Sequence, residues 1–112
     1  MEAGETQQVS WNLSQSIIME IGNLLQRANT YYLSGHLDQW FFSLKAIKMR
    51  FIQSLEPKER EELAELELNI ISMGSFKLAM IQVENYNERI MDLLQRYGYA
   101  MKLRDDLTNI NN

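Results

Sequence analysis

The stretch of the chain that decides the fold is residues 37–57, LDQWFFSLKAIKMRFIQSLEP. Its large apolar residues recur every three or four positions, the spacing that places side chains on one face of an α-helix. These residues are Leu37, Trp40, Phe41, Leu44, Ile47, Phe51 and Leu55. Because the residue before a proline avoids helical backbone angles, Glu56 and Pro57 should end the helix. The stretch therefore predicts an amphipathic helix of about five turns.

Three further segments have the same periodicity. The first begins at Ser10, a residue that caps helices well, and ends at Ser34-Gly35-His36, where Gly35 suits a left-handed position. Pro57 suits the first turn of a third helix. Gly74-Ser75 should end that helix, and a fourth is expected over residues 76–101. The chain is thus predicted to consist almost entirely of helices.

Short connections of two to four residues between these segments predict that successive helices run antiparallel. The expected fold class is all-α, an up-and-down antiparallel bundle of four helices. A three-helix variant, with Gly74 inside one long helix, is the alternative. A chain of 112 residues is expected to form one domain. We assign residues 1–9 to a flexible N-terminal tail, 10–108 to a single helical domain and 109–112 to a polar tail.

Composition excludes several classes of protein. The chain has no cysteine, so disulfide-stapled domains and thiolate metal sites are excluded. Its formal net charge is −4, whereas a general phosphate binder is usually basic, so binding to nucleic acid is unexpected. No apolar run is long enough to span a membrane, and the acidic N-terminus lacks the layout of a signal peptide. The expected location is cytoplasmic, or the host cytoplasm or virion for a phage-encoded protein.

Catalytic and metal-binding motifs are missing from the sequence. His36 is the only histidine, and its place in a predicted turn favours a structural role over general-base catalysis. Zinc sites need several histidine or cysteine ligands, and di-iron bundles need Glu-x-x-His pairs, which the chain lacks. We therefore expect a non-enzymatic protein with no metal and no cofactor.

The helix predicted from residues 37–57 has apolar residues on a second face. Phe42, Ala46 and Met49 lie there, well away from the main apolar stripe, and Trp40 is the large aromatic nearby. Aromatic residues and methionine are enriched in protein interfaces. Trp40, Phe42, Ala46 and Met49 are therefore the candidate interface, either for a partner protein or for self-association, most simply as a dimer. The alternative is that this helix is the most buried one and contacts two neighbours.

Three cations on the same helix suggest a different function. Lys45, Lys48 and Arg50 form a possible basic patch, and the alternative function is a helical protein that binds nucleic acid through it. Residues 56–67, however, contain six glutamates. If the helices before and after Pro57 form a hairpin, the cations can pair with these acids without any ligand. We favour that pairing.

Two stretches of the chain resemble known proteins. Residues 28–38 resemble the inner turn of a tetratricopeptide helical hairpin, although Trp40 and Ile47 stand where that motif has small residues. This resemblance covers a single unit and implies a helical hairpin. Residues 40–47 and 91–98 make the chain resemble small uncharacterised helical proteins of tailed phages and metagenomic relatives. That resemblance implies a role as an assembly, adaptor or host-interference protein.

Overall fold

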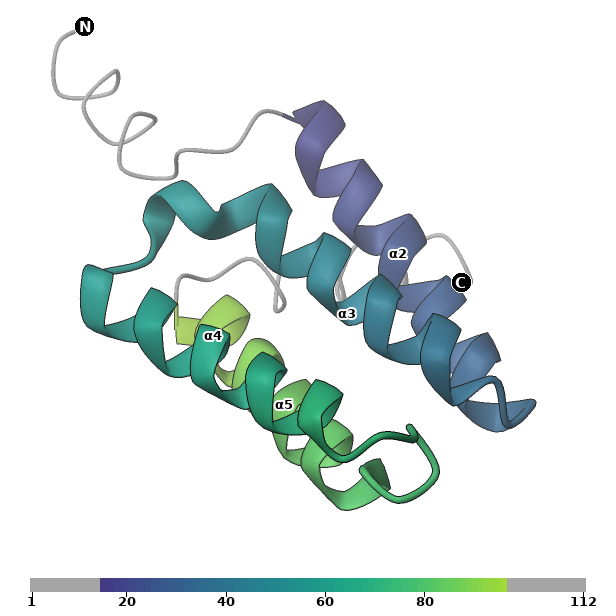
Figure 1. The fold of residues 1–112 in the computed structure, drawn as a ribbon. Helices are drawn as coiled ribbons and strands as arrows, with labels where there is room; N and C mark the ends of the chain where they lie inside the picture. The colour runs from purple at the N-terminus through teal and green to yellow at the C-terminus, as the bar shows by residue number, and fades with distance from the viewer. Residues whose placement is uncertain (1–14, 97–112) are drawn as a thin grey trace, which may run out of the picture.

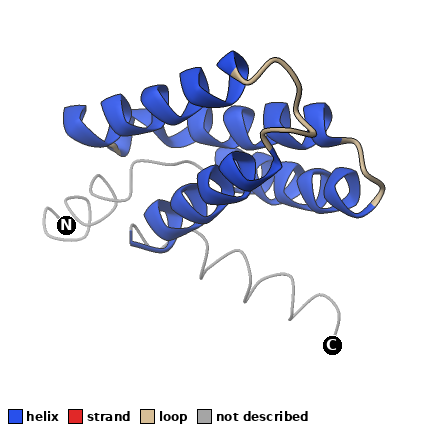
Figure 2. Ribbon diagram, turned by 60° about the horizontal axis from the view of Figure 1, so that its bottom comes forward, coloured by secondary structure: helices blue, strands red, loops and turns tan. Residues whose placement is uncertain are grey.

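The computed structural model describes residues 15–96. They form four α-helices and one 3-10 helix: α2 (Gln15–Leu33), α3 (Leu37–Phe51), η1 (Ile52–Ser54), α4 (Pro57–Ser72) and α5 (Met80–Arg96). Figures 1 and 2 show only helices and loops in this part of the chain, so the all-α prediction is confirmed. The predicted tails, the Ser10 cap and the part of the fourth helix beyond Arg96 lie outside the described residues.

Helices α2 and α3 form an antiparallel hairpin (Figure 1). Gly35, with φ of +80°, adopts the left-handed conformation predicted for it. The amide of His36 donates to the carbonyl of Tyr31 at 2.9 Å, which satisfies a carbonyl that the helix end would otherwise leave free. The helical hairpin implied by residues 28–38 is therefore present.

The junction between α3 and α4 follows the prediction with one difference. The α-helical part of α3 ends at Phe51, and the predicted last turn is instead the tighter helix η1. Pro57 is the first residue of α4, and the amide of Glu56 donates to Oε1 of Glu59 at 3.0 Å in a capping box. The chain reverses direction between α3 and α4 (Figure 1).

Gly74 separates α4 from α5, so the three-helix variant is wrong. Its φ of +83° is a left-handed conformation that cannot continue a right-handed helix. Oγ of Ser75 accepts a hydrogen bond from the amide of Leu78 at 3.2 Å. Helix α5 then begins at Met80, later than the predicted Phe76. Phe76 stays in the connection, where its ring packs against Phe41 at a centroid distance of 5.4 Å.

Helix α3 is the centre of the fold. Helices α2 and α5 both pack against it, and α4 packs against α5. The largest fully buried side chains are Ile21, Phe41, Leu44, Ile47, Phe51, Leu63, Ile70, Tyr86, Ile90, Leu93 and Leu94. The ring of Phe41 lies 5.4 Å from those of both Phe76 and Tyr86. The core thus joins α3 to α5 and to the connection before α5, while α2 packs on another side of α3.

Candidate interaction surfaces

The second apolar face of α3 is exposed. Phe42 is 54% exposed and Met49 is 49% exposed, while Ala46 between them is half-buried. The ring of Phe42 lies 5.5 Å from that of Phe41 and makes an edge-on contact with Phe76 at 5.8 Å, while its other side faces solvent. Helix α3 does contact two neighbours, α2 and α5, but within residues 15–96 neither of them buries Phe42 or Met49.

Trp40 does not belong to this surface. It is only 4% exposed, and its ring packs against Tyr32 of α2 at 4.6 Å. On a helix with about 100° of rotation per residue, Trp40 lies on the side of α3 that faces α2, far around from Phe42. The candidate interface is corrected accordingly: Trp40 is a core residue, and Phe42, Ala46 and Met49 remain.

Helix α4 extends the exposed apolar surface. Its residues Leu68 and Ile71 are 67% and 56% exposed. Lys48 of α3 pairs with Glu67 of α4, and the two helices run antiparallel (Figure 1). In that arrangement, the next residue on each helix, Met49 and Leu68, turns toward the same side of the pair. We call Phe42, Met49, Leu68 and Ile71 together the α3–α4 face.

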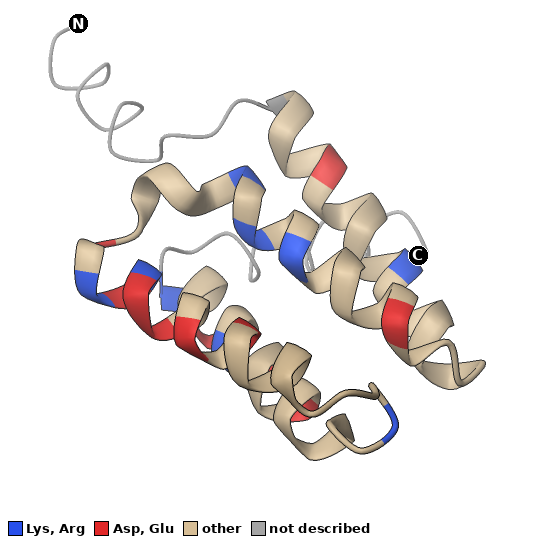
Figure 3. Cartoon of the chain, viewed as in Figure 1, with Lys and Arg blue, Asp and Glu red and all other residues tan. Residues whose placement is uncertain are grey.

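The predicted basic patch is not a free cationic surface. Lys48 is buried and bound to Glu67, and Nε of Arg50 donates to Oε1 of Glu20 on α2 at 2.7 Å. Figure 3 shows basic positions on α3 and acidic positions along α4. Of the three cations, only Lys45 forms no ion pair within residues 15–96. The patch is corrected to two ion-paired cations and one half-buried lysine.

A buried polar cluster joins α3, α4 and α5. Glu67 accepts hydrogen bonds from Lys48 and, at 2.6 Å, from the hydroxyl of Tyr86. Burial, together with this bond, raises the pKa of the Tyr86 hydroxyl, so the group stays protonated and remains a donor. Buried charges need such partners because removal from water is costly. This cluster holds α4 beside α3 and so helps to form the α3–α4 face.

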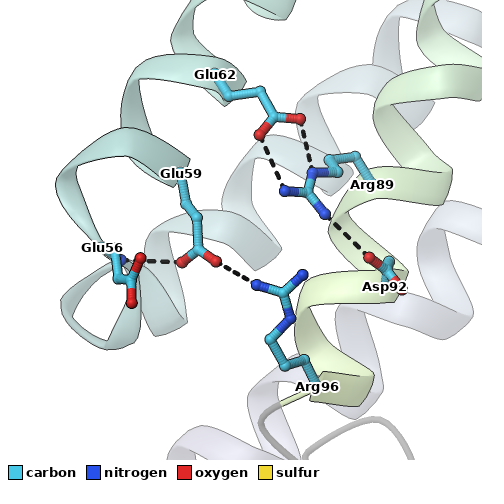
Figure 4. Close-up of polar contacts among 6 residues, drawn as sticks. All are labelled: Glu56, Glu59, Glu62, Arg89, Asp92 and Arg96. Carbon is cyan, nitrogen blue, oxygen red and sulfur yellow. Dashed lines mark hydrogen bonds and ion pairs between the residues drawn. The ribbon is translucent and has the colours of Figure 1, made fainter.

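The other side of α4 is bound to α5 by ion pairs (Figure 4). The guanidinium of Arg89 donates to both oxygens of Glu62, at 2.7 and 2.9 Å, and Arg96 donates to Glu59 at 2.6 Å. The bond from Arg89 is the main reason that the pKa of Glu62 is lowered. Arg89 also bonds Asp92 at 3.0 Å. Part of the glutamate run therefore binds helix α5.

Within residues 15–96, no group of three or more histidine, cysteine or acidic residues is arranged to hold a metal ion. His36 lies in the first turn, where its Nδ1 is 2.8 Å from Oγ of Ser34. Among the described helices, none is long and apolar enough to cross a membrane.

The fold and surfaces thus define an all-helical protein whose prominent exposed feature is apolar. Comparison with protein-family models, curated proteins and solved structures finds no match.

Proposed function

We propose that this protein works by self-association, and that the α3–α4 face is the contact between two copies. The observation that carries the proposal is the exposure of Phe42, Met49, Leu68 and Ile71, each between 49% and 67%, and helical rotation turns them toward the same side of α3 and α4. Covering one large apolar side chain stabilises a complex by roughly 1.5–3 kcal/mol. A patch of this kind on a small protein is typical of an interaction site.

A second copy is the simplest partner for this face. Two-fold symmetry lets each copy cover the other with the same residues, so every apolar contact is made twice. Phe42 and Met49 stand seven residues apart on one helix, so α3 could pack along its counterpart. A non-enzymatic role in assembly, or as an adaptor, belongs to this proposal. The nucleic-acid function receives no support from a specific observation, since Lys48 and Arg50 are already paired.

The test compares the molar mass of the wild-type protein and three variants by light scattering at high concentration. The wild-type protein should have twice the chain mass of 13.2 kDa. A Phe42→Ser, Met49→Ser variant should have the monomer mass while its circular dichroism stays helical, because these side chains contribute little to the core. A Leu68→Ser, Ile71→Ser variant should behave in the same way, since these residues lie on the same face.

Met19 and Leu33 provide a matched control. Both are exposed apolar residues, but they belong to α2 and lie outside the α3–α4 face. A Met19→Ser, Leu33→Ser variant should keep the dimer mass. The proposal is wrong if the wild-type protein is monomeric at high concentration. It is also wrong if the control variant dissociates as readily as the other two.

A further inference from the structure

A groove of about 550 Å³ lies on a different side of α3, between α2 and α5. Its floor is apolar and belongs to the core: Ala28, Trp40 and Leu44 are all almost completely buried. Leu25 of α2 and Met91 of α5 form the walls, and both are half-buried. Helices α2 and α5 each pack on α3, and the groove follows the space that a further helix would fill in a bundle.

The α5 side of the groove carries two carboxylates that no cation of the described helices neutralises. Glu84 and Glu88 stand one helical turn apart along this side. Among residues 15–96, no lysine or arginine lines the groove and neither carboxylate forms an ion pair. This sets them apart from Glu59, Glu62 and Glu67, which all bind cations. Carboxylates that flank an apolar floor fit a ligand that is both apolar and cationic.

We propose that this groove binds an amphipathic α-helix of a partner protein, with lysine or arginine residues one turn apart. The apolar side of that helix would lie on Leu25, Tyr32 and Met91, the partly exposed apolar residues above the buried Trp40, and its two cations would pair with Glu84 and Glu88. Docking of an amphipathic helix into an apolar groove is a common form of peptide recognition. The charge of the groove selects a basic helix and repels an acidic one. This site is separate from the α3–α4 face, so the proposal of peptide binding does not depend on self-association.

The test uses a designed helical peptide of leucine and lysine, with leucines on one face and lysines four residues apart on its border. Binding of the labelled peptide to the full chain is measured by fluorescence anisotropy. The contact is located by the NMR signal of the Trp40 indole N–H, which has to be distinguished only from that of Trp11, the second tryptophan. We expect saturable binding, a shift of the Trp40 signal, and no binding of a peptide with glutamate in place of lysine.

Two double variants distinguish binding in the groove from non-specific attraction of the basic peptide to an acidic protein. A Glu84→Gln, Glu88→Gln variant should bind about fivefold more weakly, the effect of losing two partly exposed ion pairs. A Glu61→Gln, Glu65→Gln variant changes the net charge equally, on exposed positions of α4 one turn apart, and should bind within about twofold of wild type. Absence of saturable binding, equal weakening in both variants or an unmoved Trp40 signal would overturn the proposal. The first of these results is also the one expected if another part of the chain fills the groove.

Discussion

Replacing Lys48 with methionine is expected to lower the free energy of unfolding by about 3–5 kcal/mol. The substitution keeps an apolar stem of similar length but removes the cation that neutralises Glu67. Glu67 would then be a buried carboxylate with one remaining partner, the hydroxyl of Tyr86. Urea unfolding followed by circular dichroism at neutral pH measures the loss.

Arg50 is the matched control for this prediction. It lies two residues further along α3 and also forms an ion pair, with Glu20, but both side chains are largely exposed. Exposed pairs contribute about 0–1 kcal/mol, so Arg50→Met should have a small effect. If Lys48→Met and Arg50→Met cost the same, the pair between Lys48 and Glu67 is not buried as the structure has it.

A triple variant tests whether the cluster adds net stability to the fold, or whether its three polar groups only need one another once they are buried. Lys48→Met, Glu67→Met and Tyr86→Phe together replace every polar group of the cluster with an apolar one. Replacing a whole buried ion pair with apolar residues is often neutral or stabilising. We therefore expect the triple variant to recover most of the stability lost in Lys48→Met alone. A triple variant less stable than the single one would contradict this account.

The second large effect is expected at Phe41. Phe41→Ala should lower the free energy of unfolding by about 3–5 kcal/mol, because it leaves a cavity where α3, α5 and the connection before α5 meet. Phe41 is completely buried, and its ring contacts those of Phe76 and Tyr86. Urea unfolding at low protein concentration measures the change without a contribution from self-association.

The neighbouring residue, Phe42, is the control, because the same substitution is made one position away on the exposed side of α3. Phe42→Ala removes a ring that is about half in solvent already, so it should cost about 1–2 kcal/mol. Equal losses for the two alanine variants would mean that Phe41 is not the centre of the core. Together the two variants test the orientation of α3 in the fold.

The sequence predicted most helix boundaries within the described residues because local chemistry sets them. Gly35 and Gly74 end helices, since each adopts a positive φ that glycine reaches without a Cβ clash. Pro57 begins α4 because it lacks the amide that the first turn leaves unpaired. The last turn of α3 and the start of α5 were predicted less well. At the start of α5, contacts of Phe76 with the aromatic rings of α3 keep it in the connection.

The candidate interface was only partly predictable. The period of α3 correctly separated Phe42 and Met49 from the core stripe, but spacing alone did not show whether another helix covers them. The buried cluster does leave a signal in the sequence. Lys48 and Glu67 occupy positions on the apolar stripes of their helices, Glu67 between Leu63 and Ile70. A charged residue at such a position calls for a partner on a facing helix.

By itself, the sequence determined the all-helical class, the antiparallel turns and the main apolar stripe of α3, because these depend on neighbours within a few positions. Only the tertiary structure decided which helices are adjacent. That choice buries Lys48 against Glu67, leaves Phe42, Met49 and Leu68 exposed, and opens the groove with Glu84 and Glu88 on one side. These features join residues far apart in the chain, and an apolar stripe does not specify which other stripe will cover it.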